Sequence, residues 1–203
     1  MAGQTQPQRT ESSLSHLVPA LLFTAVSVVV LGLVYPAIIW LIGIVAFPHQ
    51  AGGSLILSDG KAVGSALVGQ TFTRPQYFHG RPWAAGKNGN DPTQTGGTNL
   101  GPASKKLIDR VAAAVAALER ENPDATGPIP PELVTSSASG IDPDISPAGA
   151  YYQIPRVAKA RGMSQDALRA IVDAHVRGRT FGILGEPRVN VLELNLALDA
   201  AKR

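Results

Sequence analysis

A charge-free apolar run near the N-terminus constrains this chain more than any other feature. No Asp, Glu, Lys or Arg occurs between Glu11 and Asp59, and Leu17 to Phe47 is almost continuously apolar. At about 1.5 Å per residue, a helix over this run is about 46 Å long, whereas a hydrocarbon core is about 30 Å thick. The run is also about twice as long as the apolar core of a secretory signal peptide. It predicts a transmembrane helix at 17–47 that follows a short tail at 1–16.

Two residues inside the run are unusual for a plain anchor. Pro36 has no backbone N–H, so it removes one helical hydrogen bond and predicts a kink. Gly32, about one turn earlier, would let a neighbouring helix approach closely. The proline is either a kink that the membrane tolerates or part of a face that packs against a partner helix. Gly32 and Pro36 are therefore candidate helix-packing positions.

The remaining residues, 48–203, are enough for one domain with its own core. The formal net charge of the chain is +3, which is too small and too dispersed to predict a nucleic-acid partner. Cysteine is absent, which excludes disulfides and thiolate chemistry. Arg9 precedes the apolar run, whereas the first basic residue after it is Lys61. This weak bias favours a cytoplasmic N-terminus and an extracytoplasmic domain.

The domain is predicted to be of the α/β (α+β) class, with an N-terminal β-hairpin and several helices. Apolar runs at 54–57 and 62–68 flank an Asp-Gly turn, which is typical of a hairpin. Helical spacing and capping residues predict helices over 103–120, from Ser146 to 161, and from Ser164 onward.

Three further segments complete the predicted domain. Residues 70–102 and 136–147 are polar, rich in Gly and Pro, and predicted to be long loops. A short strand is expected at 133–135. For 189–200, alternating leucines favour a strand, whereas Asn190 with Glu193 three residues later resembles a capping box. The helix is slightly favoured there.

The sequence predicts neither a catalytic residue nor a metal ligand. Asp142, Asp144 and Ser146 match the first ligands of a calcium loop, but Pro147 and Gln153 stand where Gly and Glu are needed. No phosphate-binding loop surrounds the Gly-Lys pair at 60–61, and the four histidines lack metal-ligand spacing.

Two alternative functions remain open. His79 lies among loops that contain Ser and Asp, so a membrane-anchored extracytoplasmic hydrolase is one alternative, although no nucleophile elbow is present. A tethered binding module is the other. His175 lies on the apolar stripe of a predicted helix and is expected to be structural.

Four segments behind the single span resemble, in order, the C subunit of the Kdp-type potassium-transporting ATPase. The resemblance covers nearly the whole chain, and its specificity comes from the order of the four segments, since each is short. The segments are Phe78-His79-Gly80-Arg81-Pro82, Gly97-Thr98-Asn99-Leu100-Gly101-Pro102, the loop from Val134 to Pro147, and Leu184-Gly185-Glu186-Pro187-Arg188-Val189-Asn190-Val191-Leu192.

The resemblance implies a non-catalytic accessory subunit of a high-affinity, ATP-driven potassium import complex in the bacterial plasma (inner) membrane. The implied partners are an ion-conducting, potassium-binding subunit, a P-type ATPase catalytic subunit, a small single-span subunit and membrane lipid. The complex would use ATP, magnesium and potassium, whereas this chain would bind no cofactor itself. The implied role is assembly and stabilisation of the complex.

The resemblance also carries a proposed role in nucleotide binding by the catalytic subunit, for which Gln153 and Arg156 would be the residues to test. The two long loops are expected to dock on the outer mouth of the ion-conducting subunit. The candidate contact residues in these loops are Phe78, His79, Gly80, Arg81, Asn99, Leu100, Asp142 and Asp144.

Overall fold

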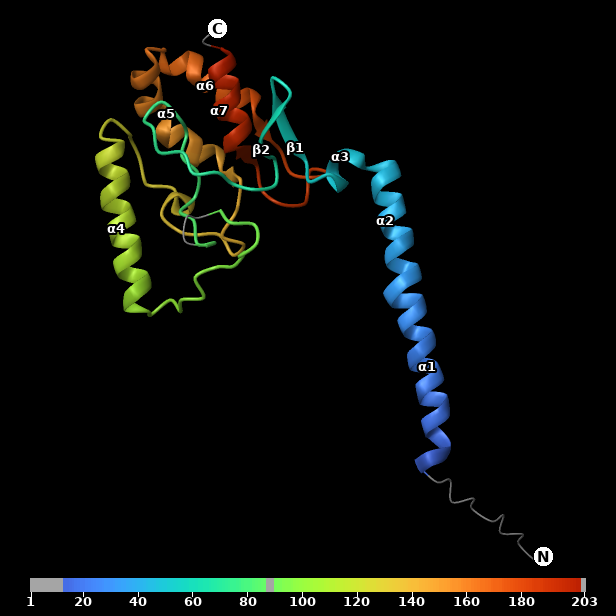
Figure 1. Ribbon diagram of the computed structural model, residues 1–203. Coiled ribbons are helices and arrows are strands. Elements are labelled where there is room, and N and C mark those ends of the chain that lie inside the picture. Colours follow the sequence, from blue (N-terminus) through green and yellow to red (C-terminus); the bar gives the residue numbers. More distant parts are fainter. Residues whose placement is uncertain (1–12, 87–89, 202–203) are drawn as a thin grey trace, which may run out of the picture. The chain divides into compact units, whose positions relative to one another are not determined.

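The computed structural model describes residues 13–86 and 90–201. The chain divides into two compact units, of which the first ends at Gly52 and the second begins at Gly53 (Figure 1). Most of the predicted tail, 1–16, lies outside the described residues. Each unit is therefore considered by itself.

The first unit is helical. Its helical segments join into one stretch from Leu14 to Ala46 that contains an 18-residue segment with a mean hydropathy of 2.6, and the stretch is long and apolar enough to cross a membrane. This confirms the predicted N-terminal apolar helix. The segments are a 3₁₀ turn (Ser13–His16), α1 (Leu17–Val29), a π-helical turn (Val30–Val34) and α2 (Tyr35–Ala46), with the short α3 (Pro48–Ala51) beyond them.

The distortion expected at Pro36 takes the form of the π-helical turn that precedes it. The Tyr35 N–H donates to the carbonyl of Val30, five residues back. In a regular α-helix the proline ring would clash with the carbonyl four residues earlier, and a wider turn relieves that clash. A Cβ built on Gly32 would meet nothing within 4 Å, so the surface of this turn is open.

The second unit begins with the predicted β-hairpin. β1 (Leu55–Ser58) pairs antiparallel with β2 (Lys61–Ser65). The turn between them has φ values of 51° at Asp59 and 74° at Gly60. Positive φ at both central residues is the pattern of a type I′ turn, for which Asp-Gly is a preferred pair.

A second, three-stranded antiparallel sheet lies deeper in this unit, with the strand order β3-β5-β4. Its strands are β3 (Asp144–Ile145), β4 (Val176–Arg177) and β5 (Arg188–Asn190). The helices around it are α4 (Lys105–Glu121), α5 (Pro147–Arg161), α6 (Gln165–Ala174) and α7 (Val191–Ala200). The mixed α/β class of the prediction is confirmed.

Local capping explains where three of these helices begin. The side chains of Ser146, Ser164 and Asn190 each accept a hydrogen bond from the backbone N–H three residues later, at 3.0–3.2 Å. α5 ends at Arg161, and the next residue, Gly162, has a φ of 66°, the left-handed conformation that favours glycine. The predicted helices therefore lie close to the observed ones.

Two segments differ from the expectation. The strand expected at 133–135 is wrong, because the chain forms a 3₁₀ turn at Pro131–Leu133. Two consecutive prolines, at 130 and 131, have no N–H to donate to a strand ladder. Segment 189–200 combines both patterns: β5 ends at Asn190, and the same residue caps α7.

The core of the second unit lies between α5, α6, α7 and β5, with contributions from loop residues. Helices α5 and α6 pack together, as do α6 and α7. Phe78, from the long loop 70–102, is fully buried in this core. The other side chains at or below 2% exposure include Ile145, Val157, Leu168, Val172, Val189, Leu194 and Leu198.

Candidate functional site

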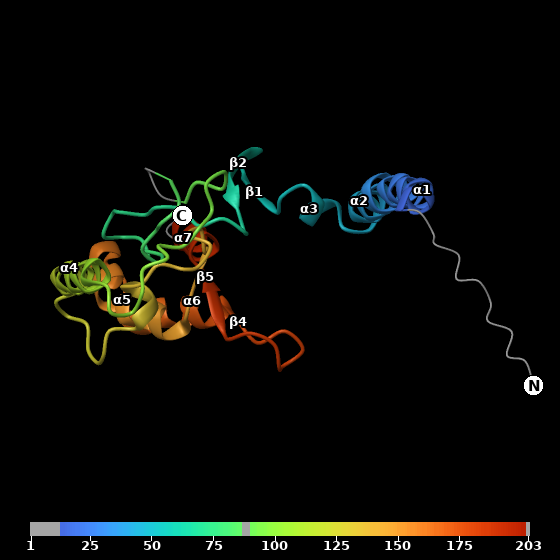
Figure 2. The same cartoon turned by 90° about the horizontal axis from the view of Figure 1, so that it is seen from below.

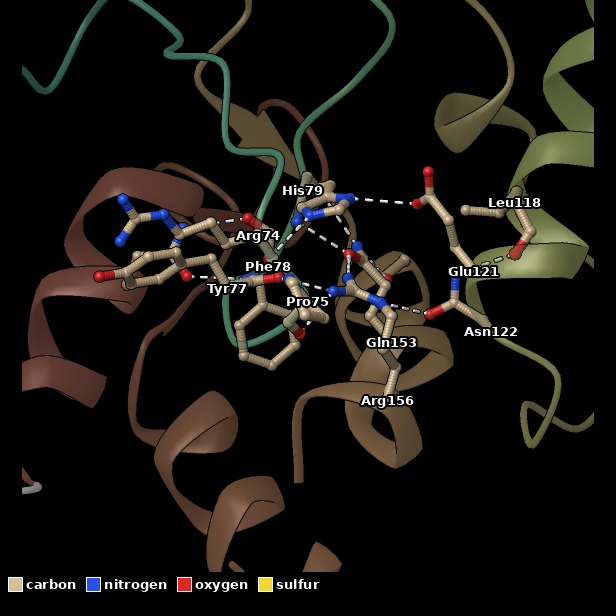
Figure 3. Close-up of polar contacts among 12 residues, drawn as sticks. Arg74, Pro75, Tyr77, Phe78, His79, Leu118, Glu121, Asn122, Gln153 and Arg156 are labelled. Carbon is tan, nitrogen blue, oxygen red and sulfur yellow. Dashed lines mark hydrogen bonds and ion pairs between the residues drawn. The ribbon is translucent and has the colours of Figure 1, made fainter. Parts of the chain in front are cut away.

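Arg156 on α5 holds together three parts of the domain (Figure 3). Its Nε donates to Asn122 Oδ1 at 2.9 Å, just beyond α4. One terminal nitrogen donates to the carbonyls of Pro75 and Tyr77 at 2.7 and 3.0 Å, and the other donates to Gln153 Oε1 at 2.7 Å. The Arg156 residue is only 8% exposed, so this buried guanidinium is satisfied by the chain itself.

Two buried amide side chains hold the neighbouring backbone. Gln153 Oε1 accepts from the His79 N–H at 2.8 Å, and its Nε2 donates to the His79 carbonyl at 3.0 Å. Asn195 on α7 binds Phe78 in the same two-point manner, at 2.8 and 3.0 Å. Phe78, His79, Gln153 and Arg156 therefore belong to one network, and their polar contacts fix the loop to the helices.

The His79 ring lies over this network at the edge of a cleft of about 370 Å³. Its Nδ1 is 3.3 Å from Glu121 Oε2, and its Nε2 is 3.2 Å from the Arg74 carbonyl. Burial lowers the pKa of His79 below its ordinary value, and the positive charge of Arg156 acts in the same direction. Glu121 and the Arg74 carbonyl oppose this shift.

The contacts of His79 bear on the hydrolase alternative. A catalytic base must lie within hydrogen-bond reach of its nucleophile. In the part of the chain that the structure describes, the ring nitrogens contact Glu121 and a carbonyl, and neither contacts a serine. The geometry therefore gives this alternative no nucleophile–base pair.

Two aspartates lie between two arginines and bring together three of the four segments that carry the family resemblance. Arg81 is 2.9 Å from Asp142, whose Oδ1 accepts the Asp144 N–H at 3.1 Å. Asp144 in turn lies 3.1 Å from the Nε of Arg188. The four side chains are between 23% and 39% exposed and line a cleft of about 380 Å³. We call Arg81, Asp142, Asp144 and Arg188 the charge chain.

The charge chain is partly desolvated. Burial raises the pKa of Asp144 above its ordinary value, and the negative charge of Asp142 adds to that rise, whereas Arg188 opposes it. The Nε of Arg81 is buried without a partner among the described residues. Because both carboxylates already lie beside arginines, the cluster is better suited to a polar protein surface than to holding a metal ion. Within residues 13–86 and 90–201, no group of three His, Cys, Asp or Glu side chains is arranged to bind one.

The fourth segment approaches the loop 134–147 only at its start, where Gly97 lies close to the backbone of Ser137 and Ala138. Leu100 lines a separate cleft of about 380 Å³ beside Lys106 and Arg110, and Asn99 has a left-handed φ of 52°. The structure therefore brings Arg81, Asp142 and Asp144 together but does not add Asn99 and Leu100 to them. Of the loop candidates, Phe78 is buried, whereas Gly80 and Arg81 are half-buried.

Sequence reasoning missed the two asparagines of the network. Asn122 and Asn195 are 4% and 1% exposed, yet both are polar. Asn195 interrupts the leucine-rich stripe of α7, between Leu194 and Leu198. A polar amide within an apolar stripe indicates a buried hydrogen bond, because such a group is seldom buried without a partner.

Comparison with known proteins places these features in a family. The family described as "KdpC: K+-transporting ATPase, c chain" matches residues 17–200. A KdpC subunit of a potassium-transporting ATPase from Koribacter versatilis is 52% identical over 188 residues, covering 92% of this chain and 95% of the relative. The relative from Burkholderia vietnamiensis is 53% identical over 184 residues, with 91% and 95% coverage. The Rhodopseudomonas palustris relative is 51% identical over 201 residues, with 94% and 99% coverage. The chain therefore belongs to the KdpC family, the c chains of K⁺-transporting ATPases.

Proposed function

We propose that this chain is the non-catalytic accessory subunit of an ATP-driven potassium import complex. It assembles and stabilises the ion-conducting and P-type ATPase subunits, together with a small single-span subunit. The observation that carries this proposal is the charge chain, in which three separate segments that resemble the family meet at one partly exposed surface. Side chains that were needed only for folding would be expected to lie deeper, as those of the Arg156 network do.

The charge chain is the proposed docking surface for the ion-conducting subunit. Polar, half-exposed charges at an interface contribute mainly to specificity and to the correct register of two proteins. The loops 70–102 and 136–147 supply three of its four residues.

Co-purification tests this docking surface directly. A tagged chain carrying Asp142→Asn and Asp144→Asn is expected to recover less of the two large subunits, or to raise the potassium concentration needed for half-maximal ATP hydrolysis. The matched control removes two exposed charges from α4, through Asp109→Asn and Glu119→Gln, and is expected to behave as the parent. Unchanged assembly and potassium affinity in the first variant would refute the role of the acidic pair.

The apolar helix is proposed to be a subunit contact as well as an anchor. Spanning needs about 20 residues, whereas the π turn and open Gly32 add features that a tether does not require. Replacing 17–47 by an unrelated span of equal length is expected to keep the chain in the membrane but to impair assembly. If the variant with the unrelated span assembles fully, the helix serves only as a membrane anchor.

The proposed topology is single-pass in the bacterial plasma membrane, with a cytoplasmic N-terminus and an extracytoplasmic domain. Reporter fusions at the C-terminus test it. A reporter that is active only outside the cytoplasm is expected to be active when it is fused to the C-terminus. Activity of a cytoplasm-only reporter would reverse the topology.

Gln153 and Arg156 are proposed to serve the fold and not a nucleotide. Their contacts with the chain engage the groups that would otherwise contact a phosphate. The test titrates a fluorescent ATP analogue onto the purified complex that carries Arg156→Lys, at a temperature low enough to keep the variant folded. The variant complex is expected to bind the analogue as tightly as the parent complex. Weaker nucleotide binding with unchanged thermal stability would assign the pair to the nucleotide instead.

A further inference from the structure

The loop between β4 and β5 exposes three large apolar side chains at its tip. Phe181, Ile183 and Leu184 are 89%, 76% and 60% exposed. The tip is nevertheless an ordered turn, because Thr180 and Leu184 exchange backbone hydrogen bonds at 2.8 and 3.0 Å. We call residues 180–184 the apolar tip.

Phe181 occupies a backbone position that does not suit it. Its φ is 54° and that of Gly182 is 75°, and the Ile183 N–H closes the turn onto the Thr180 carbonyl at 3.2 Å. Positive φ at both central residues matches a type I′ turn, whose first central residue is usually Asn, Asp or Gly. A bulky side chain in this conformation is a backbone outlier. Neither the turn nor the core requires Phe181, and such outliers indicate a contact made for function.

The lipid bilayer is the partner surface that the chain connection keeps close to the domain. Only a short connection joins Ala46, at the end of the candidate span, to Gly53, where the domain begins. At about 3.5 Å per residue, that connection reaches at most about 25 Å. The start of the domain is therefore confined near the bilayer, on whichever side it lies.

The composition of the loop also suits a membrane surface. Three arginines, at 177, 179 and 188, flank the tip, and each forms an ion pair, with Glu193, Glu186 and Asp144 respectively. The arginine side chains are still 39–50% exposed, and exposed aromatic and aliphatic side chains bordered by arginine are typical of segments that lie at the interface of a bilayer.

We propose that the apolar tip inserts into the interface of the bilayer that holds the N-terminal helix. The domain then has two membrane contacts: a permanent one through the span and a reversible one through Phe181, Ile183 and Leu184. This contact limits the rotation of the domain about its short connection. It does not depend on docking to another subunit.

The absence of cysteine from the sequence allows a direct test. The full chain carrying Ile183→Cys is labelled with an environment-sensitive fluorophore and placed in nanodiscs of phosphatidylcholine and phosphatidylglycerol. The matched control is Ile108→Cys on α4, where the apolar side chain is 58% exposed. Figures 1 and 2 show α4 on the opposite side of the domain from the β4–β5 loop.

The proposal predicts a difference between these two labels. Emission at 183 is expected to shift to the blue and to be quenched several-fold more by spin-labelled lipid than emission at 108. Equal and weak quenching of both labels would overturn the proposal. So would a label at 183 that stays in water with the chain alone and becomes shielded only in the assembled complex, because that result would identify a subunit interface.

A second variant separates the contact from the fold. Phe181→Asn keeps a residue that a type I′ turn accepts, so it is expected to raise the melting temperature while it reduces quenching at 183. Undiminished quenching would overturn the role of Phe181 as the inserted residue. A lowered melting temperature would refute the backbone strain on which the proposal rests.

Discussion

Gln153 holds the backbone of His79 at two points, because its Oε1 accepts the His79 N–H and its Nε2 donates to the His79 carbonyl. The arrangement reproduces, with a side chain, the paired hydrogen bonds of an antiparallel strand. Asn195 forms the same pair of hydrogen bonds with the backbone of Phe78. The segment around 75–79 is thus fixed to the helices without belonging to either sheet.

Removing the amide of Gln153 is expected to destabilise the domain strongly. Gln153→Ala leaves the His79 backbone and one Arg156 nitrogen without their partner, and each unsatisfied buried group costs about 1–3 kcal/mol. For these three groups together, we expect a total loss of at least about 3 kcal/mol in the free energy of unfolding. Chemical denaturation of the full chain in detergent measures it.

Lys159 provides the control on the same helix. Its ion pair with Asp124 is exposed, at 76% and 55% for the two side chains. Lys159→Ala is therefore expected to change the free energy of unfolding by no more than about 0.5 kcal/mol. If Gln153→Ala and Lys159→Ala lowered the free energy of unfolding by similar amounts, the buried amide of Gln153 would contribute no more than an exposed ion pair.

Acidification is expected to weaken the domain through His79. Its pKa is lower in the folded chain than in the unfolded chain, because of burial and then of Arg156. The unfolded state therefore binds more protons as the pH falls below about 6.5, and folding stability decreases with it. Above that pH the contribution of His79 is fully present. Denaturation curves from pH 7.5 to 5 should show this loss, and His79→Gln should reduce it.

Substitution of Glu121 supplies a second test of the same pH dependence, because the direction in which Glu121 shifts the pKa of His79 is known. Its carboxylate opposes the lowering of the His79 pKa. Glu121→Gln is expected to lower that pKa further and to extend the loss of stability to lower pH. A smaller loss in this variant than in the parent would contradict the assignment.

Two glycines with similar backbones are expected to differ in their tolerance of alanine. Gly140 and Gly162 have φ values of 73° and 66°. A Cβ at 162 meets nothing within 4 Å, whereas a Cβ at 140 would lie 2.5 Å from the Gly96 carbonyl oxygen. Gly162→Ala should cost about 1–2 kcal/mol, the penalty of the left-handed conformation alone. Gly140→Ala should cost clearly more in a thermal melt, and equal costs would argue against the close approach of these loops.

The charge chain makes a prediction about Asp144. Arg188 opposes the rise in its pKa that burial and Asp142 produce. Arg188→Gln is therefore expected to raise the pKa of Asp144 further, as followed by the carboxyl carbon resonance in an NMR titration. Lys105→Gln, which removes an exposed charge on α4, serves as the control. A pKa that falls in Arg188→Gln would contradict the pairing.

Local chemistry made much of the fold predictable. The Asp59-Gly60 turn and the capping residues Ser146 and Asn190 act on neighbours within three residues, so their effect can be recognised in the sequence. The same is true of the apolar helix, whose length and lack of charge are sufficient evidence by themselves.

Long-range pairing explains what was missed. The hydrogen bonds between Phe78 and Asn195 join residues 117 positions apart, and no local pattern announces such a partner. The strands of the second sheet are two or three residues long, too short for alternation to be recognised. Gln153 and Arg156 were singled out from the sequence, but only the structure shows that their contacts lie within the domain.

The π turn before Pro36 has a consequence for the abundance of this protein in the cell. Pro36 supplies no N–H, so a carbonyl in the preceding turn lacks its usual donor, and in hydrocarbon such a deficit is costly until a neighbouring helix compensates it. Copies without partners are then the less stable population and the first to be degraded. If the proposed helix contact forms, the abundance of the chain is therefore expected to follow that of its partners.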